Sequence, residues 1–111
     1  MTENTETSSC VYVMSAAMCD MGLYCKVGVS DDPIKRVAEV QTGCPHKIVA
    51  VTYVPLKSKA HARRAERLLH QAFRHNRTVG EWFLFEENAD WANVLYPLSQ
   101  LTSNDIRVYE V

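Results

Sequence analysis

Alternation of apolar and polar residues divides the chain into short strand-like runs separated by turns and helix-like segments. Residues 15–22 are predicted to form a loop between the strand-like runs at residues 10–14 and 23–29, so these two strands are expected to pair antiparallel. Residues 81–85 predict a short strand or an extended arm, and residues 106–111 predict a final edge strand. The three clearest runs are rich in β-branched and aromatic residues and predict strands at residues 10–14, 23–29 and 47–54.

Helical periodicity first appears after the second predicted strand. Residues 30–33 read Ser-Asp-Asp-Pro, a helix-start signal in which Ser or Asp caps the first turn and Pro occupies its first position. The helix is expected to end near Thr42, before Gly43. Its periodicity places Arg36 opposite the apolar stripe, as an exposed side chain. That stripe is predicted to consist of Ile34, Val37, Ala38 and Gln41.

A longer helix is predicted at residues 59–75, opened by Ser58 as its cap. A further helix is predicted at residues 88–100, where Pro97 limits it. The long helix carries apolar side chains at helical spacing, and these predict its buried face: Ala62, Ala65, Leu68, Leu69, Ala72 and Phe73.

These elements predict an α/β fold in which helices flank a small, mostly antiparallel, three-stranded sheet. The chain of 111 residues is long enough for one domain, expected at residues 10–111. Residues 1–9 are polar and acidic and predict a disordered leader, not a secretory signal. No apolar run is long enough to span a bilayer, so no membrane association and a cytoplasmic location are expected.

The cysteine pattern argues against a zinc site. None of the four cysteines forms a Cys-x-x-Cys pair, and their spacing matches no zinc-ligand pattern. Free cysteine in a strand-like run behaves as a small apolar residue. The prediction is therefore reduced structural thiols at Cys10, Cys19, Cys25 and Cys44.

Charge is distributed unevenly, although the net charge is only −1. Residues 57–77 hold seven Lys and Arg and one acid, whereas the rest of the chain holds five basic and twelve acidic residues. Such asymmetry predicts a local cationic surface, and a nucleic acid is a candidate partner for it. The side chains expected to contact phosphates are Lys57, Lys59, Arg63, Arg67, Arg74 and Arg77.

One acid, Glu66, stands inside this basic segment, at the border of the apolar face of the long helix. His70 lies one turn further on the same border. A carboxylate between a core and a basic face can hold a divalent ion such as Mg²⁺, and flanking arginines can hold phosphates. Alternatively, Glu66 forms an ordinary helix-surface pair with Arg63 or His70.

Several short motifs follow one another along the chain. Residues 11–13 read Val-Tyr-Val in the first predicted strand, and residues 26–28 read Lys-Val-Gly in the second. Arg36 follows ten residues after that lysine, Glu66 lies on the long helix, and residues 81–83 read Glu-Trp-Phe. This order resembles the GIY-YIG nuclease superfamily, most closely its phage and bacterial branch, over most of the chain.

The resemblance implies hydrolysis of phosphodiester bonds with one divalent ion, Mg²⁺ or Mn²⁺. Tyr12 would act as base or water-orienting group, Arg36 as phosphate clamp, and Glu66 as metal ligand. His70 is a proton-transfer candidate. Lys26 replaces the second tyrosine of the superfamily and could contact phosphate instead. Many members also carry an asparagine after the glutamate helix, and the nearest counterparts here are Asn76 and Glu81.

Two main hypotheses follow, together with a third without nucleic acid. The first is a metal-dependent DNA endonuclease, which at this size would need a homodimer, a partner protein or loose specificity. The second is a catalytically degenerate nucleic-acid-binding or regulatory module of phage origin, and the third is a protein-interaction domain. Trp82 is expected to fill the core, or alternatively to stack on a base. Tyr24 shares a strand face with Lys26 and is expected near the site.

Overall fold

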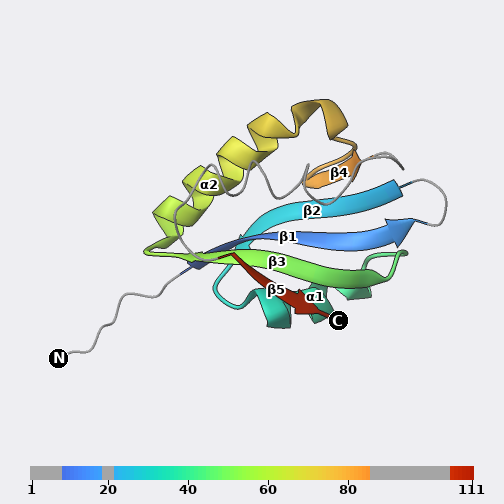
Figure 1. Ribbon diagram of the computed structural model, residues 1–111, viewed down its shortest axis with the longest axis horizontal. Coiled ribbons are helices and arrows are strands. Elements are labelled where there is room, and N and C mark those ends of the chain that lie inside the picture. Colours follow the sequence, from blue (N-terminus) through green and yellow to red (C-terminus); the bar gives the residue numbers. More distant parts are fainter. Residues whose placement is uncertain (1–8, 19–21, 86–105) are drawn as a thin grey trace.

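The computed structural model describes residues 9–18, 22–85 and 106–111, which form an antiparallel sheet with a helix on each face (Figure 1). Five strands pair in the order β4-β2-β1-β3-β5. The helices are α1 (Pro33–Thr42) and α2 (Lys59–Ala72), and a short 3₁₀ turn, η1 (Arg74–Asn76), follows α2. The strands are β1 (Ser9–Met18), β2 (Gly22–Ser30), β3 (Ile48–Leu56), β4 (Trp82–Phe85) and β5 (Arg107–Glu110).

The three predicted strands are confirmed as β1, β2 and β3, but the prediction of a three-stranded sheet is wrong. β4 pairs with the outer edge of β2, and β5 pairs with the outer edge of β3. Both added strands are four residues long, too short for alternation alone to show whether they pair. The loop predicted at residues 15–22 is also wrong, because β1 continues to Met18 and β2 begins at Gly22.

Alternation along the strands divides the interior into two layers. One layer lies between the sheet and α2, where Val11, Val13 and Val27 pack against Ala65 and Leu69. The other lies between the sheet and α1. It contains Tyr12, Met14, Val37, Ile48 and Val51. Successive side chains of β1 therefore point to opposite faces of the sheet, because side chains alternate along a strand.

α1 begins as predicted but is rotated relative to the predicted stripe. Asp32 caps the helix by accepting a hydrogen bond from the Lys35 N–H at 3.1 Å. Ile34 and Ala38, predicted to face inward, are exposed, and Pro33 and Val37 are buried instead. Helical periodicity gives the spacing of an apolar stripe, whereas contact with β3 and β1 selects which side faces the sheet.

α2 confirms the long helix but corrects its end and part of its buried face. It ends at Ala72, and η1 extends the turn to Asn76, past the predicted end. Ala62, Ala65 and Leu69 are buried as predicted, but Leu68 is 44% exposed. Ala72, also predicted to be buried, is exposed. The sheet contacts a narrower strip of the helix than the apolar pattern covers.

Two further predictions from the sequence concern other segments of the chain. The helix predicted at residues 88–100 and most of the predicted leader lie outside the described residues. Neither α1 nor α2 is long and apolar enough to cross a membrane.

The sheet buries the Cys25 side chain completely. Cys10, Cys25 and Cys44 are free, and burial raises the pKa of Cys25 to about 12. Because the thiolate is the reactive form, iodoacetamide at pH 8 is expected to leave Cys25 unmodified in the folded protein. Peptide mass spectrometry should show Cys25 alkylated only after unfolding in guanidinium. Equal alkylation of Cys25 and the half-buried Cys44 in the folded protein would contradict this expectation.

Candidate active site

The candidate site lies at the edge of β2, where its pairing with β4 stops. β4 pairs with β2 from Leu23 to Lys26, and the Val27 N–H donates to the Glu81 carbonyl at 3.0 Å. Among the described residues, no strand continues the pairing along Gly28. Groups from both faces of the sheet can therefore meet around this edge.

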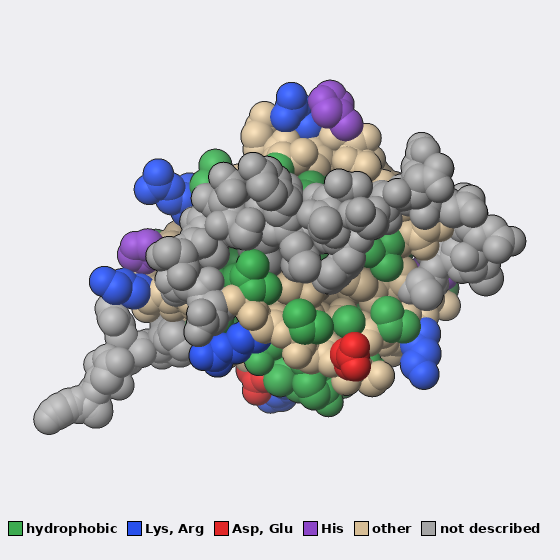
Figure 2. Space-filling model, viewed as in Figure 1, with side chains coloured by type: hydrophobic (Ala, Val, Ile, Leu, Met, Phe, Trp, Pro, Cys, Tyr) green, Lys and Arg blue, Asp and Glu red, His purple; other side chains and the backbone are tan. Residues whose placement is uncertain are grey.

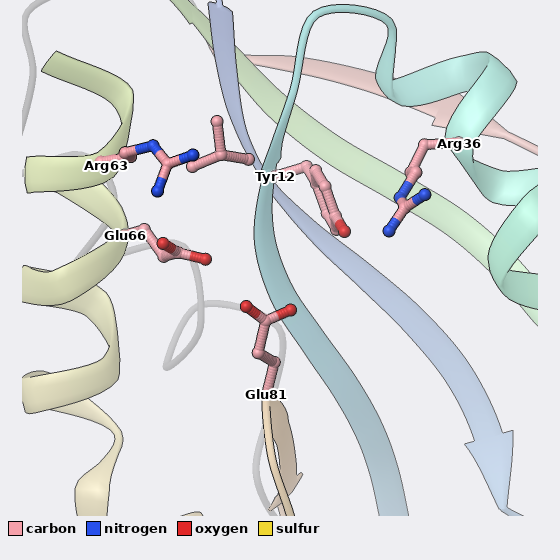
Figure 3. A pocket seen from close by; sticks show the side chains of 6 residues that line it. Tyr12, Arg36, Arg63, Glu66 and Glu81 are labelled. Atoms are coloured by element: carbon pink, nitrogen blue, oxygen red, sulfur yellow. The ribbon is translucent and has the colours of Figure 1, made fainter. Parts of the chain in front are cut away.

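A pocket of about 180 Å³ occupies this edge (Figure 3). Because a water molecule takes about 30 Å³ of liquid, the pocket has room for an ion together with several of its waters. Figure 3 shows α2 contributing side chains from one side and α1 from the other, with Glu81 below them. The lining residues are Tyr12, Val29, Arg36, Arg63, Glu66 and Glu81.

Tyr12 reaches the pocket by lying across a glycine. The two residues are direct partners in the β1–β2 register. A Cβ atom on Gly28 would stand 2.5 Å from the Tyr12 hydroxyl oxygen and 2.7 Å from the ring carbon that bears it. Real Cβ atoms do not approach other atoms so closely, so only glycine leaves room for the phenol. The ring itself is 1% exposed, so its position is held by the α1-side core.

Arg36 enters from α1 on the far side of Tyr12. Arg36 is exposed, as predicted, but the observed buried stripe of Pro33 and Val37 leaves it beside that stripe, not opposite, and it lines the pocket. Arg36 donates to the Glu39 carboxylate at 2.9 Å. The pKa of its guanidinium is raised first by this hydrogen bond and then by interaction with Tyr12. A permanent cation therefore stands beside the phenol.

Two carboxyl groups, Glu66 and Glu81, share the other side of the pocket and titrate differently. The pKa of Glu66 is raised above its ordinary value of 4.5, first by burial and then by the negative charge of Glu81. Burial also acts to raise the pKa of Glu81, but the hydrogen bond and charge of Lys26 outweigh it and lower that pKa. Glu81 therefore carries the negative charge more readily, and Glu66 is the first to take up a proton.

Lys26, which the sequence resemblance aligns with a tyrosine, pairs with Glu81. Its ammonium nitrogen lies 2.5 Å from a carboxylate oxygen of Glu81, and its side chain is only 14% exposed. The half-buried position strengthens this ion pair compared with one on the open surface. Lys26 thus stabilises the ionised form of a carboxylate in the pocket.

His70 follows Glu66 by one turn of α2 and is fixed by the sheet. Its Nε2 lies 3.2 Å from the Val27 carbonyl oxygen. Because a carbonyl only accepts hydrogen bonds, Nε2 carries a proton, and in the neutral ring Nδ1 keeps its lone pair. The ring also packs edge-on against Phe83 at 5.0 Å. Such support from a carbonyl is typical of metal-binding and proton-transferring histidines.

These residues fit a divalent cation. Glu66, His70 and Glu81 each offer one donor atom, and the three atoms lie within 4.8 Å of one another. Carboxylate oxygens suit Mg²⁺ and Mn²⁺, and an imidazole nitrogen is compatible with Mn²⁺. Burial and then the charge of Glu81 raise the pKa of Glu66, and a cation held between the two carboxylates would favour the ionised form of both.

The basic residues predicted to contact phosphates are divided by the structure. Arg63 lines the pocket beside Glu66. Lys and Arg side chains project along the margin where α2 runs (Figure 2). The others are exposed outside the pocket: Lys57, Lys59, Arg67, Arg74 and Arg77.

Glu81 is the functional candidate that the sequence indicated least clearly. The superfamily comparison named Asn76 and Glu81 as possible counterparts of an asparagine. The Asn76 side chain donates to the Leu84 carbonyl at 3.1 Å, which ties η1 to β4, whereas Glu81 lines the pocket. A sequence signal for Glu81 was its position directly before the apolar residues 82–85. These residues form β4, which pairs with β2, the strand that carries Lys26.

Comparison with known families identifies the chain. A family model described as the T5orf172 domain matches residues 9–95. The chain belongs to the T5orf172 domain family. This phage-derived family is related to the GIY-YIG nucleases, so the superfamily relationship inferred from the motifs is confirmed at this level. No curated protein and no solved structure matches the chain.

Proposed function

We propose that this T5orf172 domain is a metal-dependent endonuclease that hydrolyses phosphodiester bonds in DNA. The observation that carries the proposal is the meeting of Tyr12, Arg36 and Glu66 in one pocket, although α1, α2 and β1 lie far apart in sequence. These are the residue types that phosphodiester hydrolysis needs: a phenol, a cation for phosphate and a carboxylate for a metal ion.

The proposed roles follow from position in the pocket. Glu66, Glu81 and His70 would hold the ion, with Lys26 keeping Glu81 ionised. A bound Mg²⁺ or Mn²⁺ supplies positive charge to the phosphate and lowers the pKa of a water molecule. Because the guanidinium of Arg36 is planar, it can hold two phosphate oxygens at once.

Tyr12 is the group proposed to orient the attacking water and, as the tyrosinate, to accept its proton. The water oxygen forms a bond to phosphorus while the bond to the departing strand oxygen breaks, and that oxygen takes up a proton. The phenol is held rigidly between Gly28 and the α1-side core, so little freedom is lost when the reaction geometry forms.

Supercoiled plasmid tests this proposal directly. The protein is incubated with the plasmid in Mn²⁺, in Mg²⁺ or in EDTA, and nicked circles are separated on agarose gels. Nicking is expected with a divalent ion and is expected to stop in EDTA. Nicking that persists in EDTA would contradict the role given to the metal ion.

A second candidate function is a nucleic-acid-binding module without catalysis. The observation that favours it is the Lys26–Glu81 ion pair. Where the resemblance leads us to expect a tyrosine, the chain has a lysine whose charge is already paired with a carboxylate. Binding of DNA without nicking in either metal ion would support this candidate over the endonuclease. A dimer or partner protein that supplies specificity is compatible with both functions.

Both candidate functions predict electrostatic binding along α2. Arg67 is exposed on the same side of the helix as Arg63. Replacing Arg67 with glutamine is expected to reduce the slope of log affinity against log salt by about 0.9, the value for one lost phosphate contact. Fluorescence anisotropy with a labelled duplex measures this slope. Arg107→Gln, a variant at an exposed arginine on β5, should leave the slope unchanged. Affinity that does not change with salt would argue against nucleic acid as the partner.

A further inference from the structure

An aromatic pair lies beside the pocket on the face of the sheet that carries α1. Tyr24 and Trp82 stack with ring centroids 4.8 Å apart and an angle of 23° between their planes. His46 meets the edge of Tyr24 at 5.9 Å. All three side chains are half-buried. The prediction that Trp82 fills the core is therefore wrong, because Phe83 and Phe85 take that place from the other side of β4.

The pair is held in place by polar contacts outside the hydrophobic core. The Tyr24 hydroxyl lies 2.9 Å from the Thr78 hydroxyl. Thr78 in turn donates to the Trp82 carbonyl oxygen from both its hydroxyl, at 3.0 Å, and its backbone N–H, at 2.9 Å. Thr78 therefore holds the Tyr24 ring and the backbone of Trp82, and the Trp82 ring stacks on Tyr24. Rings fixed in advance lose little conformational entropy when a flat ligand stacks on them.

The position of the pair relates it to the pocket. Trp82 directly follows Glu81, which lines the pocket, and pairs across the sheet with Lys26. Tyr24, Lys26 and Gly28 alternate along one face of β2, so the aromatic pair, the ammonium and the Tyr12 phenol follow one another along that face. A nucleotide next to a phosphate bound in the pocket would meet these rings.

We infer that Trp82 and Tyr24 stack on an unpaired base of DNA, and that the substrate is a strand with a single-stranded nucleotide beside the phosphate to be cut. This inference depends on the proposed function. Within a duplex both faces of a base are covered by its neighbours, so a protein ring can stack only on a base that has left the helix. The cations around the pocket, Arg36 and Arg63, supply the charge that a single strand needs.

Binding measurements with single strands and duplexes test this inference. Anisotropy titrations compare a labelled twelve-nucleotide oligothymidine with a duplex of the same length, for the wild type and Trp82→Ala. The variant is expected to bind the single strand at least about tenfold more weakly, the scale of one lost base–aromatic stack. Binding to the duplex should change much less. Trp82→Phe should restore most of the affinity for the single strand, because phenylalanine keeps a stacking ring.

A matched control uses the exposed aromatic residue at the opposite edge of the sheet. Tyr109→Leu on β5 should bind both DNA forms like the wild type. Fluorescence provides a readout independent of affinity. In a Trp91→Phe background, Trp82 is the only tryptophan, and its emission should be quenched by the oligothymidine but not by the duplex.

The outcomes separate this inference from the proposed function. Equal affinity of wild type and Trp82→Ala for the single strand, without quenching, would overturn the inference. Equal loss for both DNA forms would also overturn it, because the rings would then serve the fold or general binding. Metal-dependent nicking that requires Glu66 would in either case leave the endonuclease proposal intact. Absence of both nicking and DNA binding would overturn both.

Discussion

Replacing Glu66 with glutamine is expected to slow plasmid nicking by at least about a hundredfold, in line with the loss of a metal partner or a charge-stabilising group. Glutamine keeps the shape of the side chain but removes the negative charge that would hold the cation. Glu66 shares the pocket with Tyr12 and Arg36, and it is one of the three donor residues around the possible ion position. Calorimetric titration with Mn²⁺ should show weaker binding to the variant.

The matched control for this variant is Glu110→Gln on β5, an exposed carboxylate at the other edge of the sheet. It should nick plasmid at the rate of the wild type. Equal rates for Glu66→Gln and the wild type would remove the carboxylate from the mechanism. Comparable losses in Glu66→Gln and Glu110→Gln would indicate a general effect of charge on DNA binding.

Unfolding does not explain the expected loss, since Glu66→Gln should be at least as stable as the wild type without metal. The folded protein holds the Glu66 proton more tightly than the unfolded chain, because the pKa of this group is raised. The wild type therefore loses stability as the pH rises from about 4.5 through the raised pKa. Glutamine has no proton to lose and escapes this effect. A melting temperature of the variant below that of the wild type at pH 8 would contradict the argument.

The second large effect is expected from a single methyl group. Gly28→Ala should reduce nicking by about tenfold or more, because the new Cβ would displace the Tyr12 phenol from the pocket. The displaced ring must also move within the α1-side core, which costs about 1–3 kcal/mol of stability. Binding of Mn²⁺ should change little, since Glu66 and His70 come from α2 and Glu81 precedes β4.

Gly43 provides the control for this substitution. It ends α1, and a Cβ there would meet nothing within 4 Å. Gly43→Ala should therefore retain both activity and stability. Full activity of Gly28→Ala would mean that the phenol position does not matter, and Tyr12 would lose its proposed role. Loss of Mn²⁺ binding in Gly28→Ala would show that the glycine supports the whole pocket.

Lys26 stands where the sequence resemblance leads us to expect a tyrosine. A tyrosine at this position could donate and accept a hydrogen bond, whereas the ammonium only donates. Here it lowers the pKa of Glu81 and so keeps a second carboxylate charged next to Glu66. A lysine in one strand and a glutamate before the next thus form one unit, which the β2–β4 register brings together.

Much of the local structure could be predicted from short stretches of the sequence. The three central strands, both described helices, a Ser or Asp cap for α1 and the Ser58 cap were predicted from residues close to one another in sequence. The motif order also indicated the relationship to GIY-YIG proteins that the T5orf172 match supports. Strand alternation, helical spacing and capping are properties of neighbouring residues, so a sequence pattern records them directly.

The pocket depended on contacts between distant segments. The rotation of α1 against the sheet brought Arg36 beside Tyr12, and the pairing of β4 with β2 brought Glu81 to Lys26 and Glu66. The same pairing left Trp82 half-buried on the sheet face, with Phe83 in the core. Periodicity leaves helix rotation and edge pairing open, because both are selected by packing across the sheet. The sequence alone therefore determined the elements and most of the reactive residue types, and the tertiary structure determined which of them meet.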